Sequence, residues 1–148
     1  MKFLYSKRPG ATSIIEIVLV LSVVMFLIGM VVPRVLGFMK QLKEDKTRLI
    51  MTNVNTAIAM YTNDMGHPPV PEEGGLKALI TRPKGPTGND WRGSYLPGEK
   101  SIPQDGWKNN FIYSAPPRKF KNMYKKYELY SMGKDEDDDA SDRLRVGE

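Results

Sequence analysis

The residue with the greatest chemical consequence is one carboxylate inside an apolar segment. Residues 14–32 read IIEIVLVLSVVMFLIGMVV, and Glu16 is the one charged residue among these nineteen. As a helix the segment is roughly 28 Å long, which matches the hydrocarbon core of a bilayer. An ionisable group at that depth is costly unless it has a partner. Glu16 therefore predicts an electrostatic partner, and the alternative is a side chain that reaches back to the lipid headgroups.

The remaining residue types do not assemble a catalytic site. The chain has no cysteine, which excludes disulfides, thiolate zinc sites and cysteine nucleophiles. His67 is the one histidine, and its neighbours Gly66 and Pro68 predict a turn. The chain also lacks a glycine-rich phosphate loop. We expect no enzyme.

One long helix must carry Glu16. After the apolar segment, apolar residues recur mostly at three- and four-residue steps up to Met65, with basic residues between them. Gly66 and the prolines that follow end this helix near Met65. Pro33 is expected to kink or locally unwind it. A cleaved signal peptide is disfavoured, because the apolar segment is too long and no small-x-small site follows it before Pro33.

The rest of the chain predicts a small sheet. Residues 74–81 indicate a short helix, and residues 109–114 and 124–132 have the composition of strands. We expect an α+β fold in which this antiparallel sheet packs on the amphipathic half of the long helix. The predicted core is Leu76, Leu79, Ile80, Tyr95, Trp107, Phe111, Tyr113, Tyr127 and Leu129.

Charge and composition restrict the class of protein. The chain has 148 residues, 41% hydrophobic and 26% charged, which suits one folded domain. Residues 77–126 hold eleven basic and three acidic residues, whereas residues 127–148 hold three basic and eight acidic ones. The basic stretch 118–126 contains Phe120 and Tyr124 and so admits a nucleic-acid surface. We prefer a solvated loop, or a surface that faces acidic patches of neighbouring subunits.

The N-terminal residues KRPGATSIIEIVLVLSVVMFLIGMVVPRVLG resemble those of type IV prepilins and of the pseudopilins of type II secretion. In that family a peptidase removes the basic leader, methylates the new N-terminus, and leaves glutamate as the fifth mature residue. The resemblance implies cleavage between Ala11 and Thr12, which preserves the family spacing of Glu16 and Pro33; cleavage between Gly10 and Ala11 is the alternative. It also implies that Glu16 neutralises the N-terminal amine of a neighbouring subunit.

Three later segments resemble the major pseudopilin of type II secretion in the family's order. They are MYTNDMGHPPVPEEGGLKAL, WRGSYL with IPQDGWKNNFIY, and YELYSMGKDE. The resemblance implies a type IV pilin-like fold. The expected domains are a leader at 1–11, a transmembrane and assembly helix at 12–33, and a periplasmic domain at 34–148. The last divides into a helix at 34–65, loops and a small sheet at 66–132, and an acidic C-terminal loop at 133–148.

In the major pseudopilins the C-terminal loop binds calcium, a cation that takes about six to eight oxygen ligands. The resemblance matches Asp135 and Asp142 to the ligand aspartates, and it matches Ser131, Met132 and Gly133 to the start of the loop. Two positions depart from the pattern, because Arg143 stands where an aspartate is expected and Glu136 replaces a glycine. An EF-hand is excluded, because its sixth and twelfth positions hold Ala140 and Val146. A solvated acidic tail that pairs with residues 118–126 is the alternative.

The resemblance implies a structural subunit that polymerises into a periplasmic pseudopilus and drives protein export. The alternative is a pilin of a surface or DNA-uptake pilus, whereas a lone membrane-anchored binding domain does not explain Glu16 and Pro33. Expected partners are other copies of the chain, the prepilin peptidase, minor pseudopilins, the inner-membrane assembly platform and inner-membrane lipid, but not nucleic acid. The resemblance, rather than the distribution of basic residues, orients the helix with its C-terminal domain in the periplasm.

Overall fold

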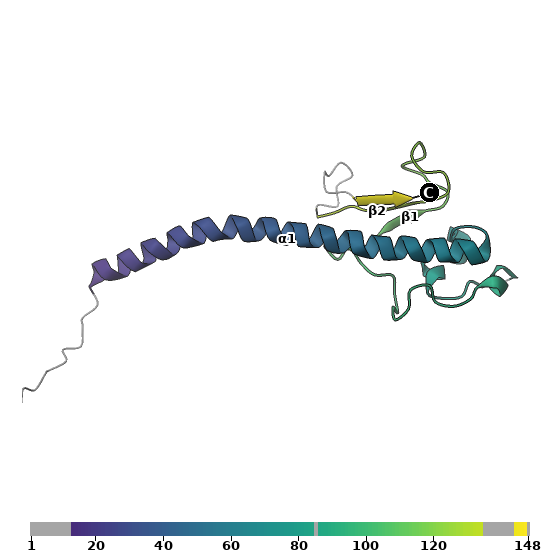
Figure 1. Ribbon diagram of the computed structural model, residues 1–148, viewed down its shortest axis with the longest axis horizontal. Coiled ribbons are helices and arrows are strands. Elements are labelled where there is room, and N and C mark those ends of the chain that lie inside the picture. Colours follow the sequence, from purple (N-terminus) through teal and green to yellow (C-terminus); the bar gives the residue numbers. More distant parts are fainter. Residues whose placement is uncertain (1–12, 85, 135–143, 148) are drawn as a thin grey trace, which may run out of the picture. The chain divides into compact units, whose positions relative to one another are not determined.

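The computed structural model describes residues 13–84, 86–134 and 144–147 (Figure 1). The chain divides into two units, one ending at Met39 and the other beginning at Lys40. Helix α1 spans Ile14–Met65, a length of 52 residues, so it contributes to both units. This confirms the predicted long helix and its end at Met65.

Two features of α1 depend on single residues. The helix ends where Gly66 takes a φ of 80° and donates its N–H to the Thr62 carbonyl over 2.8 Å. The helix continues through Pro33, so the expected local unwinding is wrong. Proline removes one helical hydrogen bond, the one to the Gly29 carbonyl, and the bonds on either side keep the helix intact.

The sheet has three antiparallel strands in the order β1-β2-β3, with β1 and β3 at its edges. The strands are β1 Ile112–Ser114, β2 Glu128–Ser131 and β3 Leu144–Gly147. The first two lie within the predicted strand ranges. Strand β3 was not predicted, and it lies in the segment expected to be only an acidic loop. Leu144 and Val146, separated by Arg145, have the alternation of a strand, but over too few residues to be distinctive.

Between α1 and the sheet the chain forms short 3-10 helices rather than α-helix. They are η1 Pro71–Glu73, η2 Gly75–Leu79 and η3 Pro86–Asp90. The short helix expected at 74–81 therefore exists as η2. Gly74, with a φ of 96°, joins η1 to η2.

The core lies between the second-unit part of α1, η2 and the sheet. Val54, Ile58 and Tyr61 of α1 are fully buried there with Leu79 and Leu129. Four predicted core residues are buried, namely Leu79, Phe111, Tyr127 and Leu129, and four pack partly buried against the cluster, namely Leu76, Ile80, Tyr95 and Tyr113.

Trp107 is not part of this core and is only half-buried, so that prediction is wrong. The neighbouring Gly106 makes the close approach to α1, because a Cβ added there would overlap the Lys43 carbonyl. The other tryptophan, Trp91, does pack against the core and donates its Nε1–H to the Ala78 carbonyl over 2.9 Å.

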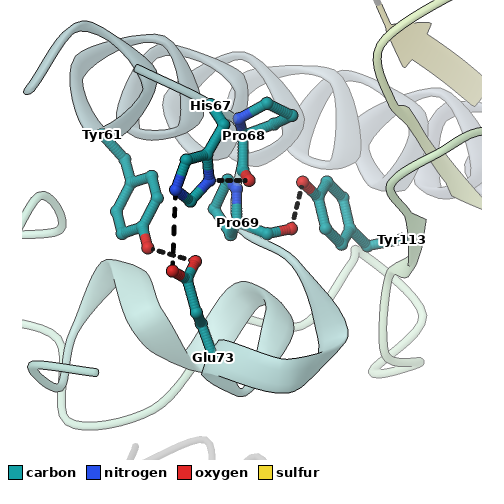
Figure 2. A network of polar contacts seen from close by, with 6 residues as sticks. All are labelled: Tyr61, His67, Pro68, Pro69, Glu73 and Tyr113. Carbon is teal, nitrogen blue, oxygen red and sulfur yellow. Dashed lines mark hydrogen bonds and ion pairs between the residues drawn. The ribbon is translucent and has the colours of Figure 1, made fainter. Parts of the chain in front are cut away.

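A polar network fixes the turn after α1 (Figure 2). The Tyr61 hydroxyl donates to Glu73 Oε2 over 2.7 Å, and His67 Nε2 lies 3.7 Å from Glu73 Oε1. The Tyr113 hydroxyl donates to the Pro69 carbonyl over 2.8 Å. Burial and the hydrogen bond to Glu73 raise the pKa of Tyr61, so its hydroxyl stays protonated and can donate. His67 is thus a turn residue, as predicted.

The connection between β1 and β2 folds back onto a buried carboxylate. Glu128, 2% exposed, accepts the backbone N–H groups of Arg118 and Lys119 on Oε1, both over 2.9 Å, and that of Phe120 on Oε2 over 2.7 Å. The Phe120 ring packs edge-on against Tyr130, with centroids 5.4 Å apart. The Phe120 ring therefore packs within the fold.

Because of this carboxylate, we expect the free energy of unfolding to fall in acid. Burial by itself would raise the pKa of Glu128. The three backbone N–H donors and the Lys119 charge together lower the pKa by more than burial raises it, so the pKa lies below the usual 4.5. Glu128 therefore stabilises the fold above about pH 4.5, and this contribution disappears as the pH falls through the lowered folded-state pKa. Glu128→Gln should cost about 1–3 kcal/mol of unfolding free energy at neutral pH and flatten the acid limb of the stability profile.

Urea unfolding of the full chain in detergent micelles, followed by circular dichroism from neutral to acid pH, measures both effects. Glu99→Gln is the control, since Glu99 is an exposed carboxylate. Equal stability profiles for the two variants would contradict the role of Glu128.

Candidate functional site

The first unit presents an apolar surface on which no other described residue packs. Every described residue from Ser13 to Met39 is exposed, including Ile14 at 81% and Phe26 at 67%. The most apolar part of α1 has a mean hydropathy of 2.9, and none of it is buried within the chain. By length and composition this helix can cross a membrane. Its apolar side chains therefore require lipid or other protein as surroundings.

Glu16 lies in the first turn of α1. The backbone N–H groups of Glu16 and Ile17 donate to the Ser13 carbonyl over 2.9 and 3.2 Å. A carboxylate in the first turn favours the helix, because it faces the positive end of the helix dipole. Within residues 13–84, 86–134 and 144–147, the Glu16 carboxylate has no hydrogen bond or ion pair. The predicted partner of Glu16 is therefore not among these residues.

The other predicted residues of the N-terminal site divide into two groups. Pro33 lies inside α1 on the same exposed segment as Glu16. The cleavage-site residues Gly10, Ala11 and Thr12 lie outside the described residues. The two residues predicted to act in assembly, Glu16 and Pro33, therefore lie on one helix.

In the second unit, a buried aspartate organises the start of the C-terminal loop. Asp105, 2% exposed, accepts the backbone N–H groups of Trp107 and Asn109 on Oδ1 over 2.9 and 2.8 Å. Its Oδ2 accepts the Ser131 hydroxyl over 2.6 Å. Asp105 was not among the predicted site residues. Its partner Ser131 is 26 residues away in sequence, so this contact has no local signal.

The residues after β2 are tied to the same loop. The Gly133 N–H donates to Ser131 Oγ over 3.1 Å, and Asn109 Nδ2 donates to the Gly133 carbonyl over 2.9 Å. Met132 lies half-buried between the two anchored residues. The start of the expected calcium loop is therefore held in one conformation.

The same loop is fastened to α1. The Gly106 N–H donates to Thr47 Oγ1 over 2.8 Å, and the buried Thr47 hydroxyl donates to the Lys43 carbonyl over 2.7 Å. Residues 105–109 thus connect the helix to the end of β2. The entire anchor belongs to the second unit.

The expected calcium ligands themselves fall mostly outside the described residues. Asp135 and Asp142 lie there, and so do Glu136 and Arg143, the two departures from the family pattern. In the part of the chain that the structure describes, no group of three acidic, histidine or cysteine side chains could hold a metal ion. The structure does fix both ends of the segment, because Ser131 and Leu144 are paired residues of β2 and β3.

Comparison with known proteins supports one family throughout. The family model described as type II secretion system protein G matches residues 34–146. A protein of Pseudomonas aeruginosa named type II secretion system core protein G is 32% identical over 138 residues, covering 92% of this chain and 91% of that one. A protein of the same name from Vibrio cholerae is 31% identical over 111 residues, covering 74% of this chain and 73% of that one.

A solved structure shares the fold. It is the crystal structure of the major pseudopilin from the type 2 secretion system of enterohaemorrhagic Escherichia coli, with a TM-score of 0.57 and 22% identity. The match covers 74% of this chain and 90% of that one. The long helix with its small antiparallel sheet is therefore the pseudopilin fold. On the family and sequence matches together, this chain belongs to the protein G family of the type II secretion system.

Proposed function

We propose that this chain is the major pseudopilin of a type II secretion system, a structural subunit that polymerises into a periplasmic pseudopilus. Growth of that filament drives protein export across the outer membrane. The observation that carries the proposal is the exposed apolar part of α1 with Glu16 in its first turn, in a chain of the protein G family. The family match favours this function over a surface or DNA-uptake pilus.

The apolar helix suits a subunit that moves from lipid into a filament. Its side chains are surrounded by apolar material in both places, so burial by itself gives little preference for either one. The decisive difference is electrostatic. A carboxylate and an ammonium that are both removed from water stabilise each other, whereas either one alone carries a desolvation cost.

The proposed partner of Glu16 is the N-terminal amine of a neighbouring copy. Removal of residues 1–11 by the prepilin peptidase makes Thr12 the first residue, and removal of residues 1–10 makes it Ala11. Either cut takes away Lys2, Lys7 and Arg8 and leaves a new amine close to the first turn of α1. In the membrane the chain has a single span with its second unit in the periplasm. There it meets minor pseudopilins and the assembly platform.

We also propose that the segment between β2 and β3 binds calcium. Its acidic side chains supply the oxygen ligands that this hard cation prefers. Asp135, Asp142 and the Met132 backbone are the groups that would hold the ion. Because Ser131 pairs with Leu144, the strands already hold the ends of the segment together, which lowers the entropy cost of gathering the ligands.

Glu16 is tested by removing its charge. Glu16→Leu should insert normally, because leucine is more compatible with lipid, but it should fail to form filaments and to support export. Glu16→Asp keeps the charge and should retain part of the assembly. Membrane fractionation, electron microscopy of pseudopili and an exoprotein secretion assay measure the three properties.

Glu44→Gln is the matched control, because Glu44 is a carboxylate on the same helix outside the apolar segment, where it pairs with Lys40. This variant should assemble like the unmodified chain. Filaments of normal number and length from Glu16→Leu would contradict the proposed role of Glu16.

Calcium binding is tested by calorimetric titration of the full chain in detergent. Calcium at about 100 times its Kd should stabilise the fold by about 2.7 kcal/mol and raise the melting temperature. Asp142→Asn should reduce both the heat of binding and the shift in melting temperature. Asp90→Asn is the control and should change neither, because Asp90 is an exposed carboxylate outside this segment. The site is ruled out if millimolar calcium produces neither heat nor a shift in melting temperature.

A further inference from the structure

A basic groove of about 1000 Å³ lies beside strand β1 in the second unit. Its lining comes from η2, residues 100–102, β1, the start of the β1–β2 connection and β2. Four cationic side chains line it, and all four are exposed: Lys77, Lys100, Arg118 and Lys119. Three separate segments of the chain therefore bring positive charge to one concave surface.

No exposed negative charge lies among the described residues that line the groove. Glu128 is the one carboxylate among its lining residues, all of which the structure describes. That carboxylate is buried and accepts the backbone N–H groups of residues 118–120. Lys77, Lys100 and Arg118 form no ion pair within the described residues. The groove therefore suits an anionic occupant.

The shape of the lining favours an extended chain segment. Strand β1 is an edge strand, and among the residues that the structure describes no strand pairs with its outer side. All residues from Asn110 to Ala115 line the groove, which places it along the whole of β1. An edge strand offers backbone hydrogen bonds to an added extended peptide, and side-chain charges beside it select the sequence.

This chain contains a segment of matching charge. Residues 136–139 read EDDD, four consecutive acids. The calcium proposal uses the acids at either side, Asp135 and Asp142, and leaves these four available.

The sheet topology favours the acidic segment of a second copy. The segment begins after Ser131 of the central strand β2 and ends before Leu144 of β3, and these two residues pair with each other on the side of β2 that faces away from β1. The groove follows the opposite edge, and Arg118 and Lys119 lie at the Glu128 end of β2.

We propose that the basic groove beside β1 receives residues 136–139 of a neighbouring copy of this chain. The contact clips the second units of adjacent subunits together, and it rests on the polymerisation proposed above. Attraction between these opposite charges adds specificity and register to an assembly whose apolar helices carry little of either.

Cysteine cross-linking tests the contact directly, because the chain has no cysteine of its own. The full chain carrying both Ser101→Cys, in the groove, and Asp138→Cys is produced in cells that assemble pseudopili, and then oxidised. We expect a ladder of covalent dimers and higher oligomers, about tenfold stronger than with either cysteine alone. Ser94→Cys with Asp138→Cys is the matched control, since Ser94 is exposed and outside the groove.

Charge reversal separates this contact from the fold and from polymerisation. Lys100→Glu should weaken the ladder about tenfold and reduce export. In a chain without the two cysteines, adding Asp138→Lys to Lys100→Glu should restore export. In the first of these experiments the Ser101 and Asp138 cysteines report the contact. Lys125→Glu, in an exposed lysine outside the groove, should change nothing.

Electron microscopy of the same cells distinguishes the two proposals. Filaments that form without the Ser101 to Asp138 link, or with a link only within single chains, overturn the groove contact and leave polymerisation intact. An unmodified chain that forms no filaments contradicts polymerisation and, with it, any contact between copies.

Discussion

Helix α1 lies in two different environments, and the rest of the structure depends on this constraint. The part of α1 up to Met39 exposes apolar side chains along its whole length, whereas its last part buries Val54, Ile58 and Tyr61 in a core. The first part is stable only in lipid or against other chains. The second part is covered by the three-stranded sheet of the same chain. Glu16 is the one charged residue in the apolar segment 14–32, where a carboxylate without a partner is costly.

The second unit is held together by buried carboxylates that are satisfied by backbone donors. Asp105 joins residues 105–109 to Ser131, and Glu128 gathers the residues that begin the β1–β2 connection. Buried acids of this kind are stable because hydrogen bonds to the charged form replace the water that is lost. Their hydrogen bonds connect the loops of the second unit to its strands. The basic groove borders this arrangement, because the buried Glu128 carboxylate accepts the backbone N–H groups of residues 118–120 and is not exposed among the lining cations.

Secondary structure with a regular residue pattern was predictable from the sequence. Contacts between residues far apart in the sequence were not. The helix and its end at Met65 follow from residue spacing and from Gly66, and β1 and β2 follow from their composition. Strand β3 was missed because three alternating residues are too short a pattern, and it gains its stability by pairing with β2. The roles of Asp105 and Glu128 depend on partners in other loops. Trp107 was misplaced because the adjacent Gly106 makes the backbone contact with α1.

The central claim is that Glu16 finds its partner in another copy of the chain. A cryo-electron microscopy map of the assembled pseudopilus, at a resolution that shows side chains, measures this directly. We predict a Glu16 carboxylate within about 4 Å of the N-terminal amine of a neighbouring subunit, inside a packed bundle of apolar helices. A Glu16 carboxylate that faces solvent or pairs only within its own chain would contradict it.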